Sequence, residues 1–153
     1  MQEKLEKGEG KMGLINSIEN FYMADKQKCF DQGLVRFDEG ESIVYEPDKP
    51  VNIQNAKAYL KHTFSLSFSG KALIAFVAIT SKNVWVYNLF QQIKIPLTNI
   101  ASAAIVKKLL LQSVVIEEKD GKKCTFSFGQ TGALRELNQK IVDEISKLVS
   151  QQV

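Results

Sequence analysis

Residues 56–68 alternate between apolar and polar side chains with a strict period of two. Successive side chains of a β-strand point to opposite faces, so this period predicts one long strand with one buried and one exposed face. Ser69, Gly70 and Lys71 form a turn signal, and an apolar run follows at 72–79. The two segments are therefore predicted to pair as a hairpin. The positions assigned to the buried face are Ala56, Ala58, Leu60, His62, Phe64, Leu66 and Phe68.

Further strands are predicted at short segments rich in β-branched and aromatic residues. One of them, 42–45, precedes the hairpin. Asp120-Gly121 lies between the last two segments and is a dipeptide favoured in tight primed turns. Six or seven short strands in succession predict an antiparallel sheet or barrel. The segments that follow the hairpin are 84–87, 93–95, 103–106, 113–117 and 123–128.

Near the two ends of the chain, the apolar residues recur with the period of a helix instead of a strand. Apolar residues between Leu14 and Phe30 recur at the three-and-four spacing of an amphipathic helix. The same spacing from Leu134 to Leu148 predicts a terminal helix of about five turns. A lone amphipathic helix is marginal in water, so this helix must pack on the sheet or into an open barrel end.

With 153 residues, the chain is long enough for one core and too short for two. Residues 1–11 are charged and punctuated by glycine, which predicts a flexible leader. Residues 12–32 are then interpreted as a helical extension, and residues 33–153 as the folded domain.

Charge is distributed unevenly along the chain. Residues 1–50 hold seven Lys/Arg and eleven Asp/Glu, whereas residues 51–153 hold thirteen and six. Between Asp48 and Glu117 there are eight lysines and no carboxylate. Acid-base catalysis needs carboxylates or several histidines, so the pattern favours a binding module over an enzyme. The basic half fits lipid headgroups, nucleic acid or an acidic protein, although solubility alone explains most modest excesses of this kind.

Candidates for catalytic, metal or cofactor sites are weak. Cys29 and Cys124 have no metal-ligand spacing and fit a reducing cytoplasm. His62 is the single histidine and falls on the apolar face of its segment, which favours a core histidine. The acidic groups lack the spacing of a calcium loop, and no complete phosphate loop occurs. We therefore expect no catalytic residue, metal or cofactor, and the longest apolar run, 72–79, is too short to span a membrane.

Residues 79–87 (ITSKNVWVY) and 95–102 (IPLTNIAS) resemble bacterial pleckstrin-homology-like (PH-like) domains related to GRAM domains. The segment 40–43, the Asp120-Gly121 hairpin and the terminal helix occur in the family's order. The chain departs from the family at Ser81 and Asn83, where asparagine and arginine are usual. The resemblance implies an α+β, mainly β fold: a partly open barrel of about seven strands, capped at one end by the C-terminal helix. Members of the family are mostly binding or assembly modules.

The resemblance also suggests where an anion would bind. PH-type domains that hold phosphorylated headgroups use basic side chains around their first hairpins, which here are Lys71 and Lys82. Lys107 and Lys108 form a secondary pair. Residues 49–116 contain no arginine, so the bidentate fork suited to specific phosphate recognition is missing.

Three functions follow as hypotheses. The first is contact with a protein partner, or self-assembly, through the open sheet edges and the N-terminal helix. The alternative is peripheral binding to anionic lipid headgroups, and a third is an apolar-ligand carrier, which needs a cavity. Nucleic acid is not expected, because Trp85 and Tyr87 do not form a stacking platform and are predicted to pack against one of the terminal helices. The predicted location is the cytoplasm, peripherally at the membrane under the second hypothesis.

Overall fold

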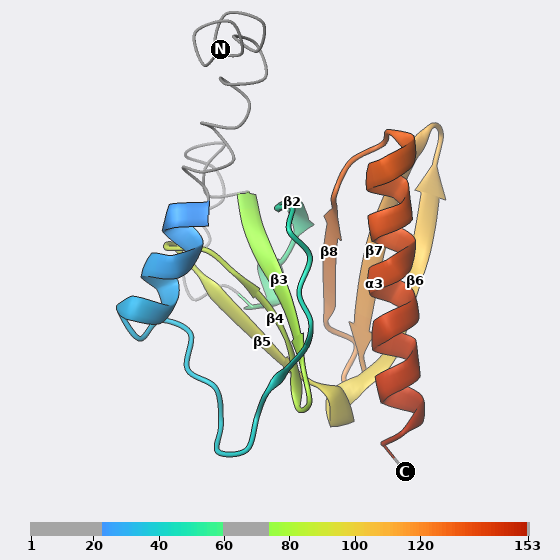
Figure 1. Ribbon diagram of the computed structural model, residues 1–153. Coiled ribbons are helices and arrows are strands. Elements are labelled where there is room, and N and C mark those ends of the chain that lie inside the picture. Colours follow the sequence, from blue (N-terminus) through green and yellow to red (C-terminus); the bar gives the residue numbers. More distant parts are fainter. Residues whose placement is uncertain (1–22, 60–73, 153) are drawn as a thin grey trace, which may run out of the picture.

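The computed structural model describes residues 23–59 and 74–152, and Figure 1 shows their arrangement. Eight strands form one antiparallel sheet in the order β5-β4-β3-β2-β8-β7-β6, while β1 pairs with β3 beside this path. The path does not close on itself. The predicted α+β, mainly β, partly open architecture is therefore confirmed. The strands are β1 (Ile43–Tyr45), β2 (Val51–Asn55), β3 (Ile74–Thr80), β4 (Asn83–Tyr87), β5 (Gln92–Pro96), β6 (Ile100–Lys108), β7 (Leu111–Glu118) and β8 (Lys123–Ser127).

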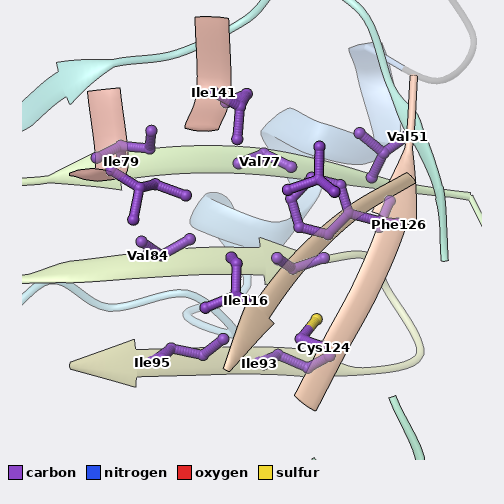
Figure 2. Packing of buried hydrophobic residues seen from close by; sticks show 14 of the residues in the cluster. Val51, Val77, Ile79, Val84, Ile93, Ile95, Ile116, Cys124, Phe126 and Ile141 are labelled. Atoms are coloured by element: carbon purple, nitrogen blue, oxygen red, sulfur yellow. The ribbon is translucent and has the colours of Figure 1, made fainter. Parts of the chain in front are cut away.

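The main core lies between the two halves of this bent sheet. Figure 2 shows side chains of β3, β4 and β5 meeting those of β7 and β8. The C-terminal helix α3 (Gly132–Ser150) packs against β6 and β7 and adds Ile141 and Ile145, both fully buried. The described part of the interior is thus occupied by side chains, which argues against the ligand-carrier hypothesis. The predicted terminal helix is confirmed.

A second apolar cluster covers the opposite face of β3 and β4. Residues 23–31 are helical, and the chain that follows lies against this face. Phe30 contacts Tyr87 edge-on with ring centroids 5.6 Å apart, and Phe37 lies 6.1 Å from Trp85. Because both faces are covered, nearly every residue of β3 and β4 is buried. Tyr87 therefore packs against the N-terminal helix, one of the two predicted places, whereas Trp85 packs against Phe37 in the segment that follows this helix.

The prediction of one long strand at 56–68 is wrong for residues 56–59, the part of this segment that the structure describes. The side-chain oxygen of Asn55 accepts a hydrogen bond from the backbone N–H of Lys57, and a 3-10 turn, η1 (Lys57–Tyr59), begins there. An Asx turn of this kind ends a strand. The rest of the segment, with His62, and the predicted hairpin turn with Lys71 lie outside the described residues.

The strand at this point is β2, which the sequence interpretation missed. It pairs with both β3 and β8 and thereby joins the two halves of the sheet. Only Val51 and Ile53 face the core, while Asn52 and Gln54 alternate with them on the exposed face and Asn55 ends the pattern. With two core positions, the period of two is too short to stand out beside Pro50.

The Asp120-Gly121 hairpin forms, but its turn is not a primed one. The N–H of Gly121 donates to the carbonyl of Glu118 at 2.9 Å, and the N–H of Glu118 donates to Lys122 at 2.8 Å. Within this turn only Gly121 has a positive φ, 93°. A primed turn with Asp120 at its centre needs a positive φ there too, so the geometry is a type I turn closed by a glycine bulge.

Candidate functional site

The four predicted lysines fall in different surroundings. Lys71 lies outside the described residues. Lys82 lies in the turn between β3 and β4, where its Nζ donates to the carbonyl oxygen of Glu39 at 2.6 Å. The loop that contains Glu39 also carries Asp38 and Glu41. Lys107 and Lys108 end β6 on the far side of the sheet, so the structure separates them from Lys82.

The loop beside Lys82 is held by the carboxylate of Glu41. Its Oε2 accepts hydrogen bonds from Asn83 Nδ2 at 3.0 Å, from Trp85 Nε1 at 2.9 Å and from the hydroxyl of Thr80. Burial alone raises the pKa of Glu41, but these donors and the N–H of Asp38 outweigh it and lower the pKa from 4.5 to about 2. Glu41 thus fastens the loop to β3 and β4.

Replacing Glu41 by glutamine is expected to destabilise the fold by about 1.5–3 kcal/mol, because hydrogen bonds to a charged acceptor are lost. The folded pKa lies below the unfolded one, so the contribution of Glu41 is full above pH 4.5 and is lost as the pH falls toward 2. Thermal unfolding from neutral to acidic pH measures this. Glu41→Gln should remove part of the acid-induced loss of stability, and equal slopes in the two proteins would contradict the role assigned to Glu41.

The hairpin between β6 and β7 ends in three exposed leucines, Leu109, Leu110 and Leu111, here called the leucine tip. Their exposed fractions are 100%, 85% and 57%. Lys107 and Lys108 precede them directly. In Figure 1 the hairpin reaches the level of the first turn of α3. Apolar groups and ammonium groups therefore share this end of the hairpin, where they line a small hollow of about 140 Å³.

The backbone of the leucine tip is strained. Leu109 has a φ of +55°, the only positive φ of a non-glycine residue in the described chain. For a residue with a Cβ and no local polar group, this left-handed conformation costs about 1–2 kcal/mol. Glycine, asparagine or aspartate normally takes such a position. Leucine here gains no burial in return.

The base of this hairpin is fixed by amide side chains. Gln130 Oε1 accepts from the N–H of Gln112 at 2.8 Å, while its Nε2 donates to the carbonyl of Gln112 at 3.0 Å. Asn138 of α3, fully buried, accepts from the N–H of Phe128 at 2.8 Å and donates toward Ser127, Gly129 and Gln112. The leucine tip is therefore held on a defined support.

A third cation joins the two lysines. Arg135 Nη2 donates to the carbonyl oxygen of Leu110 at 3.2 Å, so its guanidinium lies at the leucine tip. The first turn of α3 contains no acidic residue, and Glu136 beside Arg135 is the nearest carboxylate in sequence. The hairpin itself has no carboxylate from Ile100 to Ile116. The local charge is therefore positive.

A groove of about 480 Å³ runs along the outer face of β6, β7, β8 and β2, which is the face away from α3. Lys108 and Leu111 line it near the leucine tip, and Lys123 lines it near the other end of β7. Between them lie hydroxyl, amide and valine side chains, namely Gln54, Asn55, Val106, Ser113, Val115 and Thr125. No carboxylate lines the groove.

The sequence interpretation found Lys107 and Lys108 but assigned nothing to the three leucines. The sequence did contain an indication of this site: three consecutive leucines lie between two predicted strands, where polar turn residues are expected. Within 23–59 and 74–152, no cluster of three or more His, Cys, Asp or Glu side chains could hold a metal ion. None of the helices in those ranges is long and apolar enough to cross a membrane.

No protein-family model matches the sequence, and no curated protein matches it. Among solved structures the chain is similar to the Vps36 N-terminal PH domain, with a TM-score of 0.52 and 12% sequence identity. The match covers 75% of this chain and 86% of that chain. At this identity the likeness concerns the fold alone, and it confirms the PH-like fold.

Proposed function

We propose that this chain is a non-catalytic interaction module that attaches peripherally to anionic membrane surfaces through the leucine tip. The conformation of Leu109 is the observation that carries the proposal. It is strained, which costs stability, and it is fully exposed, so no burial within the isolated molecule offsets that cost. Insertion into a hydrocarbon layer would bury this side chain and offset that cost.

The charges around the leucine tip support the same proposal. Lys107, Lys108 and Arg135 would face the headgroups when Leu109 and Leu110 enter the bilayer. Each cation near an anionic surface contributes about 1 kcal/mol, and each leucine contributes about 1.5–3 kcal/mol at full burial. The sum is comparable to one myristoyl chain, whose binding is marginal and reversible. We therefore propose reversible attachment.

The side chains of the leucine tip favour a membrane over the other partners of a basic surface. The exposed leucines carry no aromatic ring, so they do not suit the stacking of nucleic acid bases. The flexible ammonium groups of lysine can bind lipid headgroups, because such binding requires no fixed geometry. The PH-like fold of the chain is compatible with such a role, as it is with protein binding.

Sedimentation with lipid vesicles tests the proposal. The protein should sediment with vesicles that contain phosphatidylglycerol, much less with pure phosphatidylcholine, and less at high salt because salt screens the attraction. Reversing both Lys107 and Lys108 to glutamate should weaken binding roughly 30-fold or more, at about 1 kcal/mol per charge removed.

The matched control is the reversal of Lys71 and Lys82, the first pair suggested by the sequence. It should change binding much less, because Lys82 donates to Glu39 within an acidic loop. If that control abolishes binding while the reversal of Lys107 and Lys108 does not, the membrane-binding surface is the first-hairpin surface and our placement is wrong.

A further inference from the structure

The small hollow at the leucine tip combines apolar and cationic side chains. Besides the three leucines it is lined by Lys107, Gln112 and Arg135, and none of the described residues that line it is a carboxylate. Its volume of about 140 Å³ corresponds to about five water molecules, taking about 30 Å³ for each. That is room for one phosphate group with its four oxygens. The hollow therefore has the size and the charge of a site for a single phosphate.

The cations of the hollow keep most of their hydrogen-bond donors. A guanidinium has five N–H donors, and within the part of the chain that the structure describes only Nη2 of Arg135 is engaged, by the carbonyl oxygen of Leu110. Lys107 has no ion-pair partner among the described residues. Residues 49–116 contain no arginine, but the fold brings one to this hairpin from α3. The planar fork that suits phosphate is thus present after all.

We infer that the hollow binds the phosphate of phosphatidic acid, a phosphomonoester attached directly to diacylglycerol. The inference rests on the proposed membrane attachment and names the lipid that this attachment selects. A phosphomonoester carries a charge of about −1.5 to −2 near neutral pH and has three acceptor oxygens. The phosphodiester of phosphatidylglycerol carries less charge and has fewer free oxygens. Lys107 and Arg135 therefore form more charge-assisted hydrogen bonds with the monoester.

The depth of the hollow selects this lipid over lipids with larger phosphorylated headgroups. Leu109, Leu110 and Leu111 line the hollow, so it reaches the boundary between acyl chains and headgroups when the leucine tip inserts. The phosphate of phosphatidic acid lies at that boundary, whereas an inositol ring holds the phosphomonoesters of a phosphoinositide farther out. A lipid is also selected over a soluble phosphate ester, because only a lipid brings acyl chains for the leucines to contact.

Vesicles of matched surface potential test the selectivity. Three sets contain phosphatidic acid, phosphatidylglycerol or a phosphoinositide, each in phosphatidylcholine. The natural chain should bind the first set at least about tenfold more tightly than either of the others. Equal affinity for the first two sets would overturn the inference and leave the attachment to anionic membranes intact, and tightest binding to the phosphoinositide would contradict the depth argument. Absence of binding to all three would contradict the proposed function as well.

Arg135→Lys separates recognition by the guanidinium from attraction by charge. The variant keeps a cation but loses the planar fork, so its affinity for phosphatidic acid should fall about tenfold, to the level of phosphatidylglycerol. Its affinity for phosphatidylglycerol should change by less than about twofold. Lys123→Gln, which removes an exposed cation at the other end of β7, is the control and should keep the preference. A preference that survives in Arg135→Lys, or an equal loss toward both lipids, would overturn the inference.

Glycerol 3-phosphate distinguishes the lipid from a free phosphate ester. It is the soluble equivalent of the headgroup but has no acyl chains for the leucine tip to contact. It should therefore release the protein from phosphatidic acid vesicles only at concentrations about 100-fold or more above that of the accessible lipid. Release at a concentration equal to that of the lipid would show that a soluble phosphate ester is the ligand and would overturn the choice of a lipid.

Discussion

Replacing Leu109 by glycine and Leu110 by serine is expected to lower the affinity for anionic vesicles about 100-fold or more. Each leucine would lose at least the lower end of its burial energy, about 1.5 kcal/mol, and the two losses add to about 3 kcal/mol or more. Vesicle sedimentation at fixed salt measures the change. The three cations remain in place, so a residual, strongly salt-dependent binding is expected.

The same variant should not unfold. Glycine accepts the left-handed backbone of Leu109 without a clash, so the free energy of unfolding is expected to stay equal or to rise by up to about 1 kcal/mol. Both side chains are exposed, and their removal leaves no cavity. A loss of binding could then not be attributed to a damaged fold.

Phe90→Ser is the matched control for this experiment. Phe90 is a larger apolar side chain with 63% of its surface exposed, and it lies in the turn between β4 and β5. Its replacement should leave vesicle binding unchanged. If the leucine variant binds as well as the natural chain, or if Phe90→Ser loses as much affinity, the leucine tip is not the membrane contact.

The second large effect is expected at Asn138. Leucine at this position has a similar volume but cannot accept the hydrogen bond of the Phe128 N–H, and the two hydrogen bonds that Asn138 Nδ2 donates to Ser127 and Gly129 are lost. A buried polar group without a partner costs about 1–3 kcal/mol, so we expect a loss of about 3 kcal/mol or more. For a chain of this size, that corresponds to a fall in Tm of roughly 6–12 °C.

Thermal unfolding of Asn138→Leu beside Gln139→Leu checks this expectation. Gln139 is exposed on the same helix and donates only to Asp143 one turn later, so its replacement should change stability by less than about 0.5 kcal/mol. Similar Tm values for the two variants would show that the buried amide does not hold α3 to the sheet.

Much of the fold could be predicted because its elements have clear periods. Ile141 and Ile145 recur at helical spacing, and the strand segments from 84 to 128 are bounded by turn residues, so α3 and the succession of later strands followed directly. The strand prediction failed at 56–59 because a local hydrogen bond overrides the apparent alternation there. The side chain of Asn55 ends β2 and starts η1, which no periodicity reports.

The candidate site could be predicted only in part. Lys107 and Lys108 were found from charge, but charge alone did not distinguish them from Lys82, whose partner Glu39 lies 43 residues away in sequence. The strain of Leu109 depends on a φ value that only coordinates give. The domain boundaries at 1–11, 12–32 and 33–153 and the anion-binding role of the four lysines stay predictions.

The most direct test is the emission of an environment-sensitive fluorophore attached to Leu110→Cys, read with and without anionic vesicles. The buried Cys29 and Cys124 leave position 110 as the labelled site, and a label at Val44→Cys on β1 serves as the reference. We expect a blue shift at position 110 on vesicle addition, quenching by brominated acyl chains, and neither at position 44. Vesicle-bound protein whose label at position 110 keeps its aqueous emission would contradict insertion of the leucine tip.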